Sequence, residues 1–380
     1  MLMLATFGFV DIWQNGIYGS DFSEIWAGPR VFVSGANPYD PSVWPPAIEA
    51  LGVQRPGLPV YNYPGWIPIL LAPFGAMDLD PAARIWLGLN LFIGAVGFYV
   101  LLDQLMPRLP LAFTLFGFAL VASEPGIVTF YSGQWDFLIV GLLSLMLVFL
   151  RHRRYATAGA FASVMIVKPQ LFLVAAPMLL RTTLRRRTAR FAVAFLAISG
   201  LAALASTIAF PTWWGEYLAV PAAKAGDLRA AALPNAMRDV FGAPGLLAGV
   251  ALDTLLLAAC FRFRAGGAVS TPAWLAASLV TAPYIFVYDH IVAIVPLALA
   301  TAIVAERGTA HALLVAALGF AGLVAGATFV HAVPGVAFGS LAVNGFVLYA
   351  LAALVVLAVW TWRDDDRESP MPARSSTPAK

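Results

Sequence analysis

The sequence predicts an all-α fold, a transmembrane helix bundle of about 12 segments, from its composition and its charge pattern. Apolar and aromatic residues make up 61% of the 380 residues, and the mean hydropathy is +0.82. Charged residues make up only 11%, against about 25% in soluble domains. The deficit extends along the whole chain, so composition excludes a soluble domain with one anchor. The basic residues stand in short clusters between apolar runs, which is typical of cytoplasmic loops and not of a nucleic-acid surface.

The N-terminal part is predicted as a short helix followed by a long external loop. The helix covers residues 1–15, but the apolar run Met1–Val10 is shorter than a span of roughly 20 residues and has no positively charged start. We therefore expect the chain to begin inside its first transmembrane helix. Residues 16–80 are polar and rich in Pro and Gly, and we expect them outside the membrane.

The remaining spans follow from two basic clusters, Arg151–Arg154 and the run 181–190, which the positive-inside rule assigns to the cytoplasm. A second external loop is expected at 211–242, and residues 363–380 are expected to be a disordered cytoplasmic tail. No long polar linker divides residues 1–362, so we expect one transmembrane domain. The predicted helices are about 82–105, 110–124, 135–150, 188–210, 243–261, 272–288, 291–305, 310–330 and 340–362.

Residues 155–181 lie between the two basic clusters and must therefore cross the membrane an even number of times. The pair Lys168-Pro169 breaks this segment, which leaves two helices of about 12 residues, each about 18 Å long. The hydrocarbon core is about 30 Å thick. We therefore expect a hairpin of short helices whose tip lies inside the protein, where irregular backbone is tolerated against protein or a wet cavity.

Two acids, Asp21 and Glu24, lie in the first external loop, at the start of a predicted helix over about 21–34 with Ser20 as its N-cap. The helix dipole favours a carboxylate at this end, so Asp21 can be a capping acid. It can also be a general base that takes a proton from a substrate hydroxyl within about 3 Å. Arg30 lies on the same helix and is a candidate for holding a phosphate.

Aromatic and amide side chains form a second group of candidates. Tyr39 and Tyr63 lie in the first loop, where aromatic residues either anchor the chain at the membrane interface or stack on sugar rings. Ser132–Gln134 is expected at the external start of a helix, where backbone amides form an anion site. Gln134 is therefore a candidate contact for sugar or phosphate.

Basic side chains are the candidates for binding a phosphate group. Lys168, inside the hairpin, costs roughly 2.5–3.5 kcal/mol on insertion scales, so it either snorkels to an interface or binds a phosphate. His290, next to Asp289, can bond a phosphate or orient a carboxylate, and a structural cap is an equally good interpretation. Arg238 lies in the second external loop.

Several kinds of site are absent from the sequence. There is no Gly-rich nucleotide-binding loop and no Cys/His spacing for zinc, so we expect no metal, no cofactor and no transport driven by ATP. The single cysteine, Cys260, excludes an intramolecular disulfide. No internal repeat of the kind found in many secondary transporters is visible.

The order of several motifs resembles glycosyltransferase family 87. An acid after the first helix is followed by Gly-x-Asn-Pro-Tyr at Gly35–Tyr39 and by Tyr-x-Tyr-Pro at Tyr61–Pro64. The motifs that follow in the same order are Ala72-Pro73-Phe74, Trp86, Asn90, Ser132–Gln134 and Lys168-Pro169. The resemblance covers about residues 18–180, and beyond 210 only the helix spacing and Asp289-His290 are similar. Gly65 stands where a second proline is common in the family.

This resemblance implies a C-type glycosyltransferase fold, an active site on the non-cytoplasmic side of the inner (plasma) membrane and a reaction without a metal. It implies a polyprenyl-phosphate-sugar donor and a glycolipid or glycan acceptor. Mannose is the sugar that the family suggests, and arabinose or another pentose stays open. The family's catalytic aspartate in the first external loop corresponds to Asp21.

The combined prediction is an inverting hexosyltransferase in which Asp21 takes the proton of an acceptor hydroxyl. The predicted ligands of the donor phosphate are Lys168, His290, Arg30 and Arg238. The predicted contacts to the sugar or the acceptor are Tyr63, Gln134, Glu24 and Tyr39. The alternatives are a flippase for lipid-linked sugars or another transporter, and a structural subunit of an envelope assembly. The concentration of polar residues on one predicted face favours the enzyme.

Overall fold

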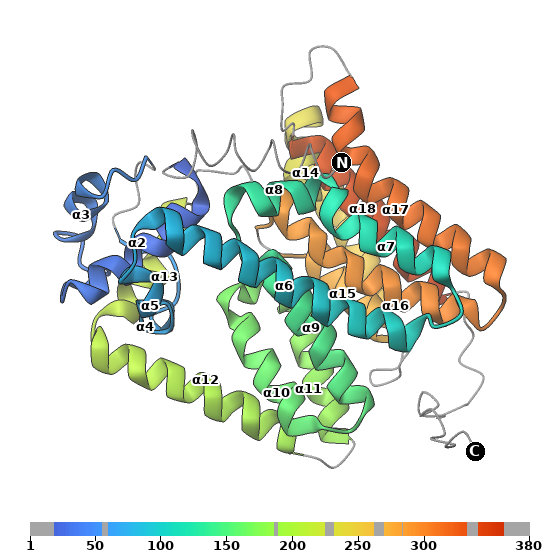
Figure 1. The fold of residues 1–380 in the computed structure, drawn as a ribbon. Helices are drawn as coiled ribbons and strands as arrows, with labels where there is room; N and C mark the ends of the chain where they lie inside the picture. Colours follow the sequence, from blue (N-terminus) through green and yellow to red (C-terminus); the bar gives the residue numbers. More distant parts are fainter. Residues whose placement is uncertain are drawn as a thin grey trace. The chain divides into compact units, whose positions relative to one another are not determined.

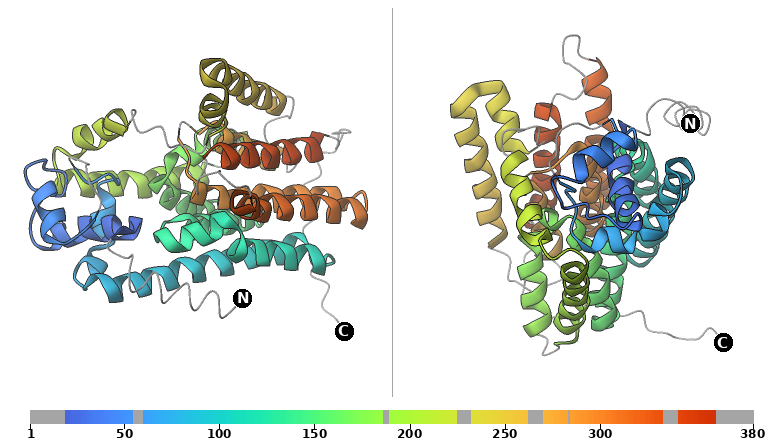
Figure 2. Two further views of the ribbon diagram at one scale, coloured as in Figure 1. Left: turned by 90° about the horizontal axis from the view of Figure 1, so that it is seen from above. Right: turned by 90° about the vertical axis from the view of Figure 1, so that its left-hand side faces the viewer.

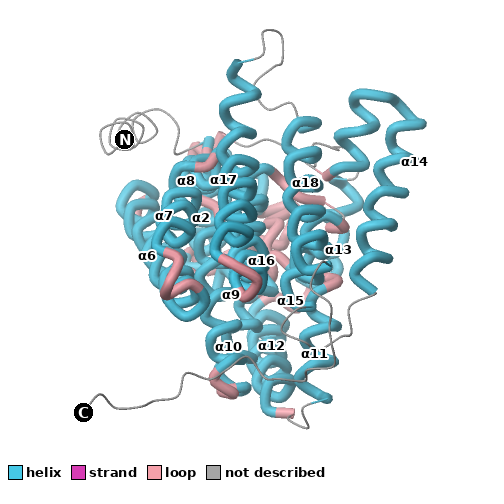
Figure 3. Tube along the Cα trace, turned by 90° about the vertical axis from the view of Figure 1, so that its right-hand side faces the viewer, coloured by secondary structure: helices cyan, strands magenta, loops and turns pink. Residues whose placement is uncertain are grey.

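The computed structural model describes residues 19–54, 60–185, 189–224, 232–261, 270–282, 284–332 and 341–360. All regular structure in these ranges is helical, and no strand occurs in them (Figure 1, Figure 3). The all-α fold class is therefore confirmed. The first predicted helix, 1–15, and the predicted tail, 363–380, lie outside the described residues.

Contacts between residues divide the chain into two compact units. Unit 1 comprises Met1–Phe92, Val128–Trp135 and Leu196–Leu228. Unit 2 comprises Ile93–Ile127, Asp136–Phe195 and Arg229–Lys380. Neither unit is a continuous stretch of chain, because the helices that include residues 92, 128 and 196 contribute to both.

Unit 1 is built around the helix that carries Asp21. Its helices are α2 (Asp21–Val33), α3 (Trp44–Ala50), α4 (Trp66–Leu70), α5 (Ala72–Gly75) and α13 (Trp213–Lys224), with parts of α6 (Leu79–Leu105), α8 (Glu124–Ser132) and α12 (Arg190–Ala209). Helix α2 packs against α3, α4 and α5. The Trp26 indole donates to the Met77 carbonyl (3.1 Å), which fixes α2 on the segment after α5. The predicted helix at 21–34 is confirmed and ends one residue earlier, at Val33.

Unit 2 is a bundle of longer helices. They are α7 (Pro110–Ala122), α9 (Asp136–Arg151), α10 (Tyr155–Val164), α11 (Ala175–Arg185), α14 (Leu233–Phe261), α15 (Ser270–Val280), α16 (Ile294–Ala305), α17 (Thr309–Ala332) and α18 (Leu341–Trp360), with the short helices η2 (Met165–Val167), η3 (Pro169–Phe172) and η4 (Val287–Ala293). Helices α16, α17 and α18 pack on one another, α7 packs on α17, and α14 and α15 pack on α18 (Figure 2).

Four of the described helices are long and apolar enough to cross a membrane: α6, α12, α14 and the continuous Val287–Ala305. The pair α7 and α8, bent by 41°, makes a fifth if it is one span. The chain is therefore a multi-pass membrane protein, but the expected count of about 12 segments is not confirmed. Several predicted spans are short helices: α9 has 16 residues and α15 has 11, about 24 Å and about 17 Å.

Helix α14 is two antiparallel arms that meet at Gly242. Gly242 has φ +66° and ψ −152°, a conformation outside the helical region. A Cβ added to Gly249 would lie 2.5 Å from Cα of Pro234, so the first arm lies against the second. The apolar span of this helix therefore starts after Gly242, as predicted for 243–261. The segment 211–242, predicted as an external loop, contains α13 and the first arm of α14.

The segment 155–181 contains two short helices separated by a break. Helix α10 ends at Val164, α11 begins at Ala175, and Lys168 between them has φ −129° and ψ 69°. The Pro169 ring and the non-helical conformation of Lys168 before it explain why neither helix continues through the break. The path of this segment through the membrane stays a prediction.

Candidate active site

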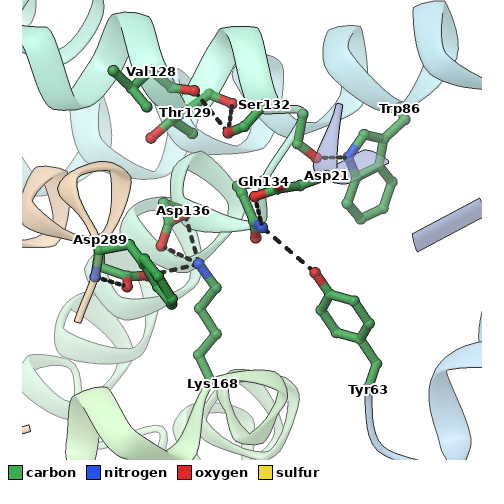
Figure 4. Close-up of polar contacts among 12 residues, drawn as sticks. Asp21, Tyr63, Trp86, Val128, Thr129, Ser132, Gln134, Asp136, Lys168 and Asp289 are labelled. Atoms are coloured by element: carbon green, nitrogen blue, oxygen red, sulfur yellow. Dashed lines mark hydrogen bonds and ion pairs between the residues drawn. The ribbon is translucent and has the colours of Figure 1, made fainter. Parts of the chain in front are cut away.

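Asp21, Gln134 and Tyr63 come together in unit 1, although they are far apart in the sequence (Figure 4). Asp21 is the first residue of α2, and both Asp21 and Gln134 are 4% exposed. Gln134 Nε2 donates a hydrogen bond to Asp21 Oδ2 (2.5 Å) and a longer one to the Tyr63 hydroxyl (3.5 Å). The structure thus gathers an acid, an amide and a phenol that the sequence nominated separately.

The turn that carries Gln134 ends α8 and does not begin a helix. Gly133 has φ +66°, and the amides of Gly133 and Gln134 donate to the carbonyls of Phe130 (3.3 Å) and Thr129 (3.2 Å). This pair of bonds closes a helix C-terminus around a left-handed glycine. The predicted anion site at Ser132–Gln134 is therefore wrong, because these amides already satisfy the last carbonyls of α8. The next helix begins only at Asp136.

Three aromatic side chains fix this turn beside α2. The Trp86 indole donates to the Gly133 carbonyl (2.7 Å) and packs edge-on against Trp135, with ring centroids 4.5 Å apart. Phe22 stacks on Trp86, and a Cβ added to Gly133 would lie 2.6 Å from Phe22 Cβ. Close packing and backbone conformation both require glycine here, and together they direct Gln134 towards Asp21.

Tyr39 and Tyr61 are fully buried and hold the backbone around Tyr63. The Tyr39 hydroxyl donates to the Tyr63 carbonyl (2.6 Å), and Tyr61 donates through its amide to Pro38 O (3.0 Å) and through its hydroxyl to Ile25 O (3.2 Å). Burial raises the pKa of Tyr39 and of Tyr61 well above the ordinary value, so both phenols stay protonated donors near neutral pH. Tyr39, a predicted sugar contact, therefore binds backbone, whereas Tyr63 is half-buried.

Two further predicted residues lie on α2. Glu24 is buried one turn after Asp21, at 8% exposure. Arg30 Nη1 donates to the Gly75 carbonyl (3.0 Å), and its guanidinium lies 5.9 Å from the centre of the Trp26 ring. Arg30 thus takes part in packing α2 onto α5. The ligand roles of both residues stay predictions.

Unit 2 holds a second buried group of charges, centred on Lys168 (Figure 4). Lys168 Nζ donates to both carboxylate oxygens of Asp136, at 2.9 and 2.8 Å, and to Asp289 Oδ1 at 2.6 Å. Both aspartates are fully buried, and the Tyr288 ring centre lies 4.5 Å from Nζ. Asp289 also accepts a bond from the Phe286 amide (2.8 Å), which caps the short helix η4.

The predicted phosphate ligand Lys168 is already bound by carboxylates of the protein. An ammonium group has three donors, and three carboxylate oxygens lie within hydrogen-bond distance of Lys168 Nζ. His290 follows Asp289 in η4 and is 2% exposed. Arg238 Nη2 pairs with Asp239 Oδ1 at 3.2 Å on the surface of unit 2. The phosphate-binding roles of these residues stay predictions, and the structure gives Lys168 two carboxylate partners that the sequence analysis missed.

A signal for those partners was present. Asp136 starts an otherwise apolar helix, and Asp289 lies in a segment that continues into the apolar α16. A charge buried in such surroundings is retained when an opposite charge pairs with it. Lys168 is the lysine of the predicted hairpin, and the acids of these apolar segments are its predictable partners.

Comparison with known protein families identifies a match over most of the chain. The family model of glycosyltransferase family 87 matches residues 61–325, which is more than half of the 380 residues. The matched region contains Tyr63, Gln134, Lys168 and His290, and it begins after Asp21. No curated protein and no solved structure matches the chain.

Proposed function

The chain belongs to glycosyltransferase family 87, and from this premise we propose which transfer it performs and with which residues. It is a membrane glycosyltransferase. The proposed donor is a polyprenyl-phosphate sugar, with mannose as the first candidate, and the proposed acceptor is a hydroxyl of an envelope glycolipid or glycan. The proposed site of reaction is the non-cytoplasmic face of the inner membrane. Helix α9 begins at Asp136, two residues after Gln134, and ends at the cluster Arg151–Arg154, which the positive-inside rule assigns to the cytoplasm.

The observation that supports this proposal most is the buried carboxylate of Asp21 bound by the side-chain amide of Gln134. A neutral donor orients the carboxylate without cancelling its charge, so Asp21 keeps the capacity to accept a proton. Asp21 lies before the family match, whereas Gln134 and Tyr63 lie within it. The hydrogen bond from Gln134 therefore joins Asp21 to the region that the family model matches.

The proposed reaction is a single displacement. The acceptor oxygen attacks the anomeric carbon, its proton moves to the Asp21 carboxylate, and the bond between the anomeric carbon and the phosphate oxygen breaks. Polyprenyl phosphate leaves with the bonding electron pair. One displacement on one face of the sugar inverts the anomeric configuration, and it needs one base and no enzyme nucleophile.

Gln134 and Tyr63 are proposed to bind the sugar or the acceptor beside Asp21, since their amide and phenol groups already share a hydrogen bond there. Glu24, one turn along α2, is proposed to bind acceptor hydroxyls. Tyr39 is proposed to act through Tyr63, because its ring is fully buried and its hydroxyl binds the Tyr63 carbonyl.

For the donor phosphate we favour His290, a buried imidazole that can donate to an anion. Lys168 is proposed to act less directly, because two carboxylates surround its ammonium and leave the group of three with a formal charge of −1. Arg30 and Arg238 stay secondary candidates, since each guanidinium binds a protein oxygen.

The proposal is tested with purified protein in liposomes, an envelope glycolipid extract as the source of acceptors, and a panel of polyprenyl-phosphate sugars that includes mannose and arabinose. Release of polyprenyl phosphate together with a new glycoside of inverted anomeric configuration is expected for one sugar of the panel. Flux of the lipid-linked sugar across the bilayer without any glycoside, or a retained configuration, contradicts the proposal.

A further inference from the structure

Helix α13 begins directly after a helix long enough to cross the membrane. Helix α12 has 20 residues, about 30 Å, which equals the thickness of the hydrocarbon core. It ends at Ala209, and α13 starts at Trp213. The Phe210 amide donates to Ser206 O (2.7 Å) and the Trp213 amide to Phe210 O (3.1 Å), so the connection is a tight turn. Helix α13 therefore starts at the level where α12 leaves the membrane.

The Trp214 indole is held at that level by α12 itself. Trp214 Nε1 donates to the Thr207 hydroxyl at 3.0 Å, and Trp213 Nε1 approaches the same oxygen at 3.4 Å. Thr207 precedes the end of α12 by two residues, about 3 Å along the axis. The two indole rings stack with centroids 4.0 Å apart, which fixes the plane of Trp214.

Exposed apolar side chains lie on α12 and on α13, which the bond from Trp214 to Thr207 joins, and we define an apolar patch by four of them. Their exposed fractions are 57% for Leu204, 74% for Ile208, 45% for Trp214 and 64% for Leu218. Each helix contributes two residues four positions apart, which lie on one face of an α-helix. Only 11% of the apolar window of α12 is buried inside the protein, so the patch extends the surface that a membrane span turns towards lipid.

We propose that α13 is an interfacial helix and that Trp214 and Leu218 lie in lipid at the headgroup level of one leaflet. Tryptophan is favoured at this level because its ring is apolar and its N–H needs a partner, which Thr207 provides. Lipid is the occupant, and not a second protein, because the patch is continuous with the flank of α12 and lies where that helix ends.

The residue next to Trp214 in α13, Trp213, contacts the side chains that support the Asp21 site. Trp213 is 2% exposed and packs on Tyr39 with ring centroids 6.1 Å apart. Tyr39 in turn binds the Tyr63 carbonyl. The interfacial helix thereby sets the depth of the Asp21 site relative to the lipid surface, a consequence that rests on the proposed function.

The test is a measurement of lipid contact that needs no donor or acceptor. Cys260, the single cysteine, is replaced by Ala, and a spin label is attached to Leu218→Cys or, as the control on the same helix, to Glu216→Cys. In liposomes, collisions with oxygen, which dissolves in lipid, are compared with collisions with a water-soluble nickel chelate. Oxygen is expected to exceed the chelate several-fold at position 218 and to fall below it at position 216.

Two outcomes overturn the proposal: equal access of the chelate at both positions, which places α13 in water, or a label at 218 shielded from both reagents, which places it against protein. A second measurement covers failure of the labelled variant to fold. Brominated lipids are expected to quench the tryptophan fluorescence of the wild type more than that of Trp214→Phe, and equal quenching contradicts lipid contact. Neither measurement depends on transfer, so the proposed function can fail separately.

Discussion

Two buried charged sites among the described residues differ in the side chains that bind their carboxylates. In unit 1, the Asp21 carboxylate receives a hydrogen bond from the neutral amide of Gln134. In unit 2, the carboxylates of Asp136 and Asp289 receive theirs from the charged Lys168. A carboxylate that accepts a hydrogen bond from a neutral amide can still accept a proton. A carboxylate paired with an ammonium group is stabilised in its charged form and is a poorer base. We therefore expect mutations in unit 1 to change turnover and mutations around Lys168 to change stability.

The largest expected effect is on turnover in Asp21→Asn. The amide keeps the size of the side chain but cannot act as a base, so kcat is expected to fall by about 10²–10⁴. Turnover of the polyprenyl-phosphate sugar is the measurement, and thermal unfolding in detergent is the control, with an expected change close to zero. Near-wild-type turnover would remove the base assignment and with it the contrast between the two groups.

The second prediction concerns stability in Lys168→Met. Removal of the ammonium leaves two buried carboxylates without their counterion, and the expected loss is about 3–5 kcal/mol of unfolding free energy. Arg84→Met is the matched control. It breaks an exposed ion pair with Asp80, whose side chains are 59% and 51% exposed, and the expected change is below about 1 kcal/mol.

A rescue experiment separates the structural role of Lys168 from a role in binding phosphate. Adding Asp136→Asn and Asp289→Asn to Lys168→Met is expected to restore part of the lost stability, because no buried charge then lacks a partner. If Lys168→Met instead unfolds like the wild type and raises KM for the donor, Lys168 is a phosphate ligand. The assignment of a purely structural role to the Lys168 group is then wrong.

The parts of the structure that the sequence predicted are those that depend on local signals. The start of α2 at Asp21 was predicted from Ser20 and the acids of the first turn, and Ser20 is the N-cap residue but forms no side-chain capping hydrogen bond. The break at Lys168 follows from Pro169. The span predicted at 243–261 agrees with the second arm of α14, and the structure adds that Gly242 separates the two arms. Asp21, Gln134 and Tyr63 were nominated by residue type and motif order, and the structure adds that they touch.

Features that depend on distant packing could not be predicted in the same way. Lys168 meets Asp136 across 32 residues and Asp289 across 121, and no local pattern specifies such a contact. Tyr39 has a side chain that can stack on a sugar or bond to backbone, and only its burial decides between them. The expected number of about 12 membrane segments is not confirmed, because apolar runs such as that of α15 form helices of only 11 residues.

The third prediction tests the glycine that directs Gln134 towards Asp21. Gly133→Ala places a Cβ 2.6 Å from that of Phe22, and the left-handed conformation alone costs about 1–2 kcal/mol. Loss of stability and loss of transfer are expected together, since the turn shifts. Gly117→Ala is the control, because nothing lies within 4 Å of its added Cβ in α7. An equal effect of both substitutions would show that the turn does not require glycine at position 133.

The smallest effect is expected for Tyr39→Phe. This variant tests whether the bond from the Tyr39 hydroxyl to the Tyr63 carbonyl contributes to transfer or only to stability. The variant keeps the buried ring and loses the bond to the Tyr63 carbonyl, a stability cost of about 1 kcal/mol. Tyr61→Phe is the matched comparison, since it loses a bond to the carbonyl of Ile25. Both variants should unfold at similarly lowered temperatures, but only Tyr39→Phe should lower kcat/KM, by up to about fivefold. If both variants lower kcat/KM equally, Tyr39 contributes only to general stability, and the Tyr39 hydroxyl does not position Tyr63.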